Sequence, residues 1–119
     1  MTAPLLGDVI PELIRILAPL GVPVVPLVPA KRPPELVRVT PAGGDAEGPW
    51  LARPIVTVEV WAGTPKRARY LAQQARDLIL DAAETSDLIH DAEATMPVFL
   101  PDPDTPIQRA VFTTQLVII

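Results

Sequence analysis

The chain has 119 residues, of which 49% are hydrophobic and 4% aromatic, and its formal net charge is −4. This length predicts one domain, and the acidic balance disfavours a protein that binds nucleic acid by neutralising phosphates. Because the sequence has no cysteine, disulfide frameworks and thiolate sites are excluded. The surplus of aliphatic residues indicates that part of the apolar surface is buried against other chains.

The sequence predicts a protein without a membrane span. Its most apolar stretch, residues 5–28, is interrupted by Asp8, Glu12 and Arg15 and by several prolines, whereas a spanning helix needs about 18 or more consecutive apolar residues. The residues at the start carry no Lys or Arg, although a signal peptide begins with a basic region. We therefore expect the protein to stay in the cytoplasm in which it is made.

A first helix is predicted over residues 5–17, where apolar residues recur at intervals of one, three and four. Two starting points are consistent with this pattern. The helix begins either at a cap on Thr2 or at Asp8, which places Pro11 in the first turn, because a proline inside a helix costs about 3 kcal/mol. Gly21 is expected to end it.

Extended structure is predicted next. Residues 21–29 carry a proline at every third position, which indicates an edge strand or a stiff polyproline-like connector; the alternative is an arm that lies across a neighbouring subunit. Residues 35–40 are predicted to form a short strand. A polar, glycine-rich loop over 41–48, together with 49–52, is predicted to form the tip of a long hairpin, with its second arm at 54–61.

The second hairpin arm and the last strand, 108–119, alternate between two faces. The predicted core face is apolar and consists of Val56, Val58, Val60, Ala110, Phe112, Leu116 and Ile118. The opposite face is half polar and consists of Ile55, Thr57, Glu59, Trp61, Val111, Thr113, Gln115, Val117 and Ile119. A solvated sheet face usually alternates more cleanly than this.

A second helix is predicted from Thr64, a good N-cap, with Pro65 at the first helical position, to about Glu84. Its narrow apolar stripe consists of Ala68, Leu71, Ala72, Ala75, Leu78, Ile79 and Ala82. The predicted fold is α+β, a single domain over 1–119: a mostly antiparallel sheet with a long hairpin and two helices packed on one face.

The charges of this second helix oppose its dipole. Three basic residues lie at the N-terminal end and three acidic residues near the C-terminal end, where each forgoes a few tenths of a kcal/mol. One explanation is a solvated face. The alternative is that the basic end of one subunit meets the acidic end of the next in a ring. The candidates for this subunit interface are Lys66, Arg67, Arg69, Asp77, Asp81 and Glu84.

Candidates for contact with a partner lie in two loops. Trp50 and Leu51 are large apolar residues beside a polar turn, and exposed anchors of this kind tend to bind other proteins; the alternative is that Trp50 folds back onto its own domain. Asp102 and Asp104 alternate with prolines and are expected to point outward from a rigid loop, which loses little entropy on docking, or simply to connect two strands. Arg53, next to the hairpin tip, is the fifth candidate for contact with a partner.

Catalytic chemistry is not indicated by any motif. Acidic residues surround His90 between positions 81 and 93, but their spacing fits no metal-binding motif, and a solvated acidic edge explains them. Ser86 does not stand in a Gly-x-Ser-x-Gly pattern, and Gly43-Gly44 is not followed by the residues of a phosphate loop. We expect no catalytic residue, no metal and no cofactor.

Taken in order, these elements resemble the tail terminator, or tail completion, proteins of long-tailed, non-contractile phages. The features that carry the resemblance are the N-terminal helix, the strand 55–62, the Ala-rich helix 68–82 and the segment 101–109 before the terminal strand. The resemblance implies a hexameric ring that caps the tail tube, halts its polymerisation and meets a head-side connector or stopper protein. It also implies a place at the neck end of the virion tail, assembly in the host cytoplasm, and DNA that passes through the lumen without specific binding.

Other classes remain open. Head-closure or head–tail joining proteins of the phage neck share this size and composition. A small acidic ligand-binding or enzyme-accessory domain would show a pocket with convergent polar groups and a perturbed titratable residue. A host adaptor or chaperone would differ in its mass in solution.

Overall fold

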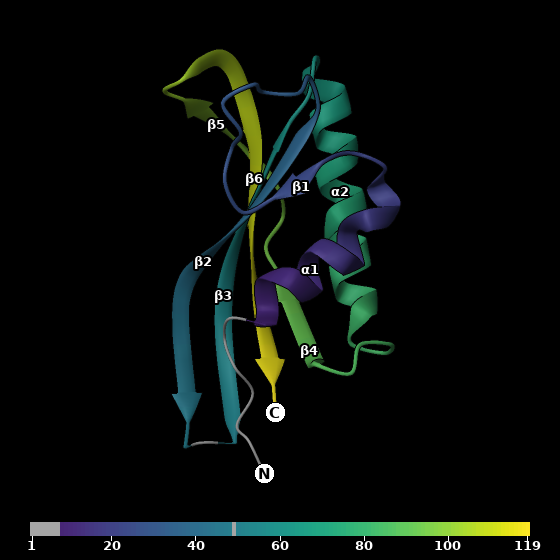
Figure 1. Cartoon of the computed structure of the whole chain (residues 1–119), viewed down its shortest axis with the longest axis vertical. Helices are drawn as coiled ribbons and strands as arrows, with labels where there is room; N and C mark the ends of the chain where they lie inside the picture. Colours follow the sequence, from purple (N-terminus) through teal and green to yellow (C-terminus); the bar gives the residue numbers. More distant parts are fainter. Residues whose placement is uncertain (1–7, 49) are drawn as a thin grey trace.

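A six-stranded sheet and two α-helices form the described part of the chain (Figure 1), which confirms the predicted α+β class. The structure is a computed structural model, and it describes residues 8–48 and 50–119, with the side chains of 106–108 excepted. In chain order the elements are α1 (Val9–Leu17), the 3-10 helix η2 (Ala18–Leu20), β1 (Val24–Val25), β2 (Leu36–Glu47), β3 (Leu51–Trp61), α2 (Pro65–Ala82), β4 (Ile89–Ala94), β5 (Val98–Asp102) and β6 (Thr105–Ile118).

The sheet is mostly antiparallel, with the strand order β1-β2-β3-β6-β4. β1 runs parallel to β2, and the other pairs are antiparallel. β6 pairs with β3 along one edge. Along its other edge it pairs with β5 through its first half and with β4 through its second half, as Val98↔Val111 and Ala94↔Thr114 illustrate. The last strand of the chain therefore organises the sheet.

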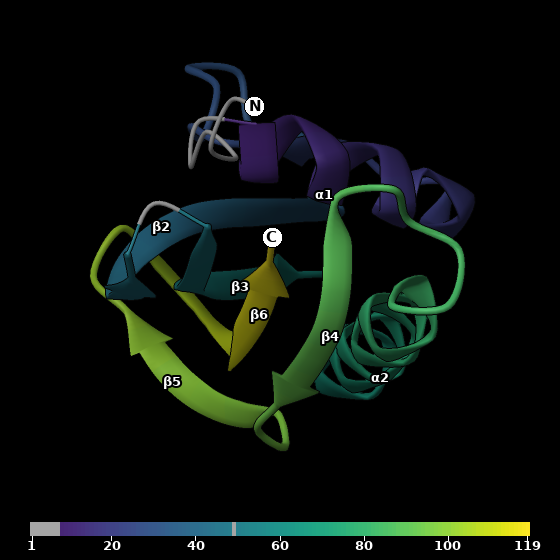
Figure 2. The same cartoon turned by 90° about the horizontal axis from the view of Figure 1, so that it is seen from below.

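Both helices pack on one face of this sheet, as predicted. Strand register places Val39, Val58 and Phe112 side by side, and all three are fully buried in the core that the helices cover. Seen along the molecule, α1 lies over β2 and α2 lies beside β4 (Figure 2). The predicted stripe of α2 is buried, apart from Leu78, which is partly buried against the core. Its small alanines allow α2 to lie close to the sheet.

The first helix follows the second of the two predicted starting points. Asp8 is its N-cap residue, so Pro11 lies in the first turn, where the backbone N–H has no partner within the helix. Gly21 follows the 3-10 turn with φ +73°, as a terminating glycine does. The alternative cap on Thr2, and Leu5 and Leu6 of the predicted stripe, lie outside the described residues.

The predicted loop over 41–48 is wrong, because β2 continues to Glu47 and the hairpin is longer than expected. Its register shifts between Pro41 and Gly44, which marks a β-bulge. Gly43 and Gly44 adopt φ values of +95° and +122°, which suit glycine at a bulge. The glycines that indicate a loop in the sequence therefore bend a strand.

Two strands were not expected. The acidic segment after α2 forms β4, and the guanidinium of Arg76 donates hydrogen bonds of 3.1 Å to the carbonyl oxygens of Ala94 and Thr95 at its end. Of the two alternatives for the proline-rich segment 101–106, a rigid outward loop or a connection between two strands, the structure shows the second. The segment contains the turn of a hairpin between β5 and β6, in which Asp102 pairs with Thr105. The proline-rich segment contributes β1, an edge strand as predicted.

Candidate functional site

The sheet face opposite the helices carries polar residues in rows that strand register sets. One row crosses β2, β3 and β6 through Thr40, Thr57 and Thr113. The next row contains Arg38 and Glu59, which are paired across β2 and β3. This is the half-polar face that the sequence predicts, and we call it the open face.

A buried aromatic residue lies on the open face near the end of β3. The indole Nε1 of Trp61 donates a 2.5 Å hydrogen bond to Oδ2 of Asp102. The guanidinium carbons of Arg32 and Arg38 lie 4.9 and 5.5 Å from the centre of the Trp61 ring, which is within the range of cation–π attraction. The ring therefore holds β2, β3, the β5–β6 hairpin and the segment before β2 together.

Ion pairs extend this arrangement. The carboxylate of Glu59, a residue only 5% exposed, accepts a 2.8 Å hydrogen bond from Nε of Arg38. On its other side, Nε of Arg109 lies 3.1 Å from Oε2 of Glu59. Arg109 Nη1 also lies 3.8 Å from Asp102 Oδ1. We name the six residues Arg32, Arg38, Glu59, Trp61, Asp102 and Arg109 the Trp61 cluster.

The prediction that Asp102 points outward is wrong, because its side chain is only 2% exposed. Burial alone would raise the pKa of this carboxyl group. The backbone N–H of Asp104, the indole of Trp61 and the charges of Arg32 and Arg109 outweigh burial and hold its pKa below the ordinary value. Asp102 is thus an internal part of the fold, whereas Asp104 is exposed.

The sequence did not predict that four residues of the Trp61 cluster contact one another or Trp61. These residues are Arg32, Arg38, Glu59 and Arg109. One signal was available. Glu59 interrupts an otherwise apolar and β-branched strand beside Trp61, and a charged residue in such a strand is rarely buried unless it is paired. The partners themselves come from distant segments, and spacing along the chain does not reveal them.

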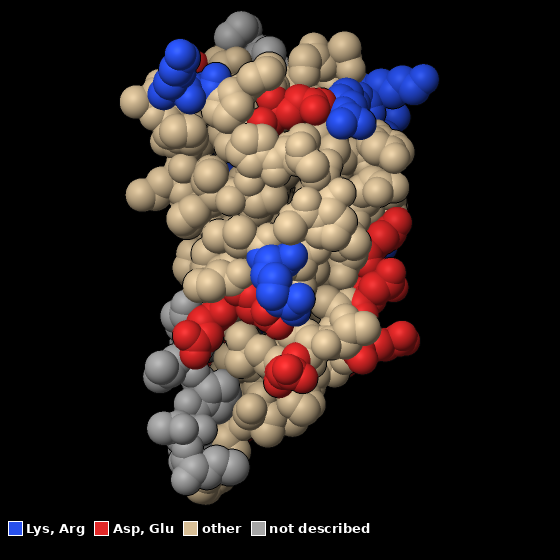
Figure 3. Space-filling view, turned by 45° about the vertical axis from the view of Figure 1, so that its right-hand side comes forward, with Lys and Arg blue, Asp and Glu red and all other residues tan. Residues whose placement is uncertain are grey.

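The basic and acidic groups of charged candidates stay apart within one chain. Five of the six residues lie on α2, and Glu84 lies in the turn after it, because the helix ends at Ala82 rather than at about Glu84. Along 18 residues the helix spans about 27 Å at 1.5 Å per residue, so its basic and acidic ends do not meet. Figure 3 shows basic side chains at the upper end with an acidic patch between them, and acidic side chains along the lower right edge. Lys66, Asp77, Asp81 and Glu84 are exposed. Their role in a subunit interface stays a prediction.

Two of these basic residues have partners in their own chain. The guanidinium of Arg67 donates hydrogen bonds of 2.7 and 3.3 Å to the carboxylate of Glu35, and this pairing lowers the pKa of Glu35. Arg69 lies over the ring of Phe99 on β5, 5.4 Å from its centre. Because Arg67 is already paired with a carboxylate, it is less available than Lys66 or Arg69 for an ion pair with a neighbouring subunit.

The hairpin tip carries an exposed tryptophan. Trp50 is 58% exposed, and its indole lies alongside Gly48, where an added Cβ would meet Trp50 Cδ1 at 3.7 Å. The structure thus does not fold Trp50 back into the core. Leu51 is half-buried. Arg53 lies between the two acidic side chains of the facing strand, with Nη1 at 3.5 Å from Asp45 and 3.3 Å from Glu47.

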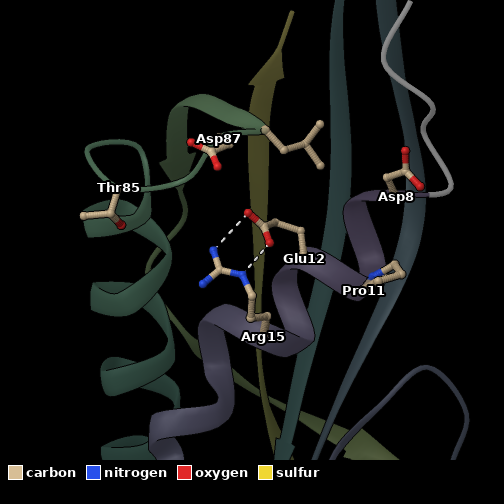
Figure 4. Close-up of a pocket in the computed structure, with 7 residues that line it drawn as sticks. Asp8, Pro11, Glu12, Arg15, Thr85 and Asp87 are labelled. Carbon is tan, nitrogen blue, oxygen red and sulfur yellow. Dashed lines mark hydrogen bonds and ion pairs between the residues drawn. The ribbon is translucent and has the colours of Figure 1, made fainter.

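A pocket of about 720 Å³ lies between α1 and the segment before β4 (Figure 4). Its lining residues are Asp8, Pro11, Glu12, Arg15, Thr85, Asp87 and Leu88. Glu12 accepts hydrogen bonds of 2.7 and 3.0 Å from Arg15 and one of 2.5 Å from Ser86, and these partners lower its pKa. Ser86 Oγ also accepts hydrogen bonds from the backbone N–H groups of Leu88 and Ile89. These polar groups bond to one another and fix α1 to the turn that leads into β4.

Comparison of the chain with protein-family models and with curated proteins finds no match. Across residues 8–48 and 50–119, no helix is both long and apolar enough to cross a membrane. In the same part of the chain, no three His, Asp or Glu side chains are grouped so as to hold a metal ion.

Proposed function

We propose that the chain is a structural virion protein that forms a closed ring of identical copies, most simply a hexamer. The ring caps the tail tube of a long-tailed phage, stops its polymerisation and joins it to a head-side connector or stopper protein. One structural observation supports the assembly into a ring: several large apolar side chains are exposed. They are Leu27, Trp50, Tyr70, Met96, Val98, Leu100 and Ile119.

The distribution of these side chains favours a contact between unlike surfaces. Trp50 and Ile119 follow the strand ends at one extreme of the longest axis, whereas Val98 and Leu100 belong to β5 near the other extreme (Figure 1). A contact between two different patches, repeated from copy to copy, closes into a ring when the rotation permits. Exposed apolar residues of this size commonly mark such contacts.

Charge is compatible with DNA that passes through the ring without being held. The net charge is −4, and affinity for phosphates rises with the number of Lys and Arg residues that neutralise them. Three arginines on the open face, Arg32, Arg38 and Arg109, are already paired with Glu59 and Asp102. An acidic ring with paired arginines would let DNA slide.

The proposal is tested by adding the purified chain to polymerising tail tube protein and measuring tube lengths by electron microscopy. We expect tubes that stop growing and carry a ring at one end. Tubes of unrestricted length, with no chain bound at their ends, would contradict the proposal. Binding to the head-side connector without binding to tube ends would instead support the related function of head closure.

A further inference from the structure

A small groove lies between the first half of α2 and β5. It has a volume of about 170 Å³ and is lined by Arg69, Gln73, Met96, Pro97, Val98, Phe99 and Ala110. Its floor is apolar, because Ala110 is buried and Phe99 packs against the core. Its rim is exposed: Met96 is 63% and Val98 54% accessible. The groove therefore offers apolar surface that the fold itself leaves uncovered.

The groove has the size and chemistry to receive an aromatic ring. A cavity of about 150 Å³ is large enough to bind benzene. Met96 brings a thioether, which contacts aromatic rings favourably. Arg69 already stacks on Phe99, and its guanidinium would lie close to a second ring in the groove. An aromatic side chain that carries acidic neighbours would fit best.

The hairpin tip of the same chain has these properties. Trp50 is exposed, and the adjacent strand end presents Asp45 and Glu47, whose side chains are 67% and 72% exposed. On the other side, Lys66 stands one helical turn before Arg69, and residues three apart share a helix face. Arg53 pairs with both carboxylates, so these three tip residues carry a net charge of −1 (−2 + 1). A tip with this charge and a protruding indole is complementary to a basic, apolar groove.

The two surfaces cannot meet within one chain. The hairpin tip lies at one extreme of the longest axis (Figure 1). Ala52, close to the tip, pairs with Ile118 of β6, whereas Ala110 of the groove lies eight residues earlier on the same strand (118 − 110 = 8), which is about 26 Å at 3.3 Å per residue. A tip that fills such a groove must therefore come from a second copy.

We propose that Trp50 of one copy inserts into the groove between α2 and β5 of the next copy, with Asp45 and Glu47 facing Lys66 and Arg69. This inference rests on the proposed ring and specifies its seam. The contact joins unlike surfaces, so its repetition closes into a ring when the rotation between copies permits. It assigns the basic end of α2 to the hairpin tip of the neighbour rather than to the acidic end of the neighbour's helix.

The seam is tested by disulfide cross-linking. Because the chain has no native cysteine, any disulfide must join the introduced thiols. A chain with Glu47→Cys and Gln73→Cys places one thiol at the tip and one in the groove lining. The matched control, Glu47→Cys with Asp81→Cys, moves the second thiol to the far end of the same helix. We expect the first pair to give a ladder of covalent oligomers after oxidation, with and without assembled tail tubes, and the control to give none.

Truncation provides a second measurement that does not depend on introduced thiols. Trp50→Ala should leave the melting temperature unchanged and weaken ring formation about tenfold or more, as loss of an interface anchor does. A ladder from the control pair alone, with rings that tolerate Trp50→Ala, would overturn the seam and leave the ring intact. If the wild-type chain forms no ring, even at tube ends, the seam and the proposed function both fail.

Discussion

The 2.5 Å hydrogen bond from Trp61 Nε1 to Asp102 Oδ2 joins two residues that lie 41 positions apart. Trp61 ends β3, and Asp102 ends β5. The bond therefore fastens the β5–β6 hairpin to the open face of the sheet. Because the same carboxylate lies near Arg32 and Arg109, its burial is compensated by charge as well as by the indole.

Trp61→Phe should lower the free energy of unfolding by about 1–3 kcal/mol, because it removes the shorter hydrogen bond to the buried Asp102 Oδ2 and leaves that oxygen only the 3.5 Å bond from Arg32. The phenyl ring keeps an aromatic face for Arg32 and Arg38. Trp50→Phe is the matched control, since Trp50 is exposed, and it should change stability by less than about 0.5 kcal/mol. Urea denaturation measures both. Equal values for the two variants would show that the Trp61 bond contributes nothing.

Stability should fall in acid as Asp102 takes up a proton. The pKa of Asp102 is lower in the folded chain than its ordinary value of 3.8, so the folded state favours the charged form. The stability that this provides is complete above the ordinary pKa and is lost as the pH falls through the folded pKa. Asp102→Asn should reduce the loss of unfolding free energy on acidification from about pH 5 to about pH 2. An unchanged acid dependence in Asp102→Asn would contradict this assignment.

Glu59→Ala should be among the most damaging single changes in the chain. It leaves the partly buried guanidinium groups of Arg38 and Arg109 without their shared carboxylate, and breaking a buried pair in this way costs about 3–5 kcal/mol. Glu47→Ala removes an exposed partner of Arg53 and should cost less than about 1 kcal/mol. The two variants are compared by thermal and urea unfolding, and a small effect of Glu59→Ala would mean that water replaces the carboxylate.

Sequence reasoning predicted the elements whose residues face one continuous core. The apolar stripe of α2 repeats with the period of a helix, and the helix begins at the Thr64 cap followed by Pro65. The apolar residues around Val58 and Phe112 alternate as in a strand. In both cases the period of the apolar residues identifies the element and its buried face. The sequence-based prediction failed where glycine and proline lie within strands or in the tight turn between two strands. The Gly43-Gly44 bulge and the β5–β6 hairpin were both read as loops, because these residues mark turns more often than bulges.

The candidate site was harder to predict, since it depends on residues that only the fold brings together. Asp102 lies between prolines in sequence, which suggests exposure, but tertiary contacts with Trp61 and Arg32 bury it. For Trp50 the sequence left two alternatives open, an exposed anchor or a side chain folded back onto the domain, and the structure shows the exposed one. The groove beside Phe99 was not, because β5 itself was not expected.

Gly44→Ala should test the bulge that lengthens the hairpin. A Cβ at Gly44 would lie 2.3 Å from the carbonyl oxygen of Arg53, a clash with backbone at a φ that only glycine adopts easily. We expect faster amide hydrogen exchange along the hairpin and a lower melting temperature. Gly63→Ala is the control, because nothing lies within 4 Å of its added Cβ, and the hairpin should then exchange as in the wild type.

Ring formation is the central claim, and native mass spectrometry of the wild-type chain released from capped tail tubes tests it most directly. We expect a single closed species whose mass is six times that of the chain, with no larger open oligomers. A chain that leaves the tube ends as a monomer, or that is bound there as a single copy, would contradict the claim.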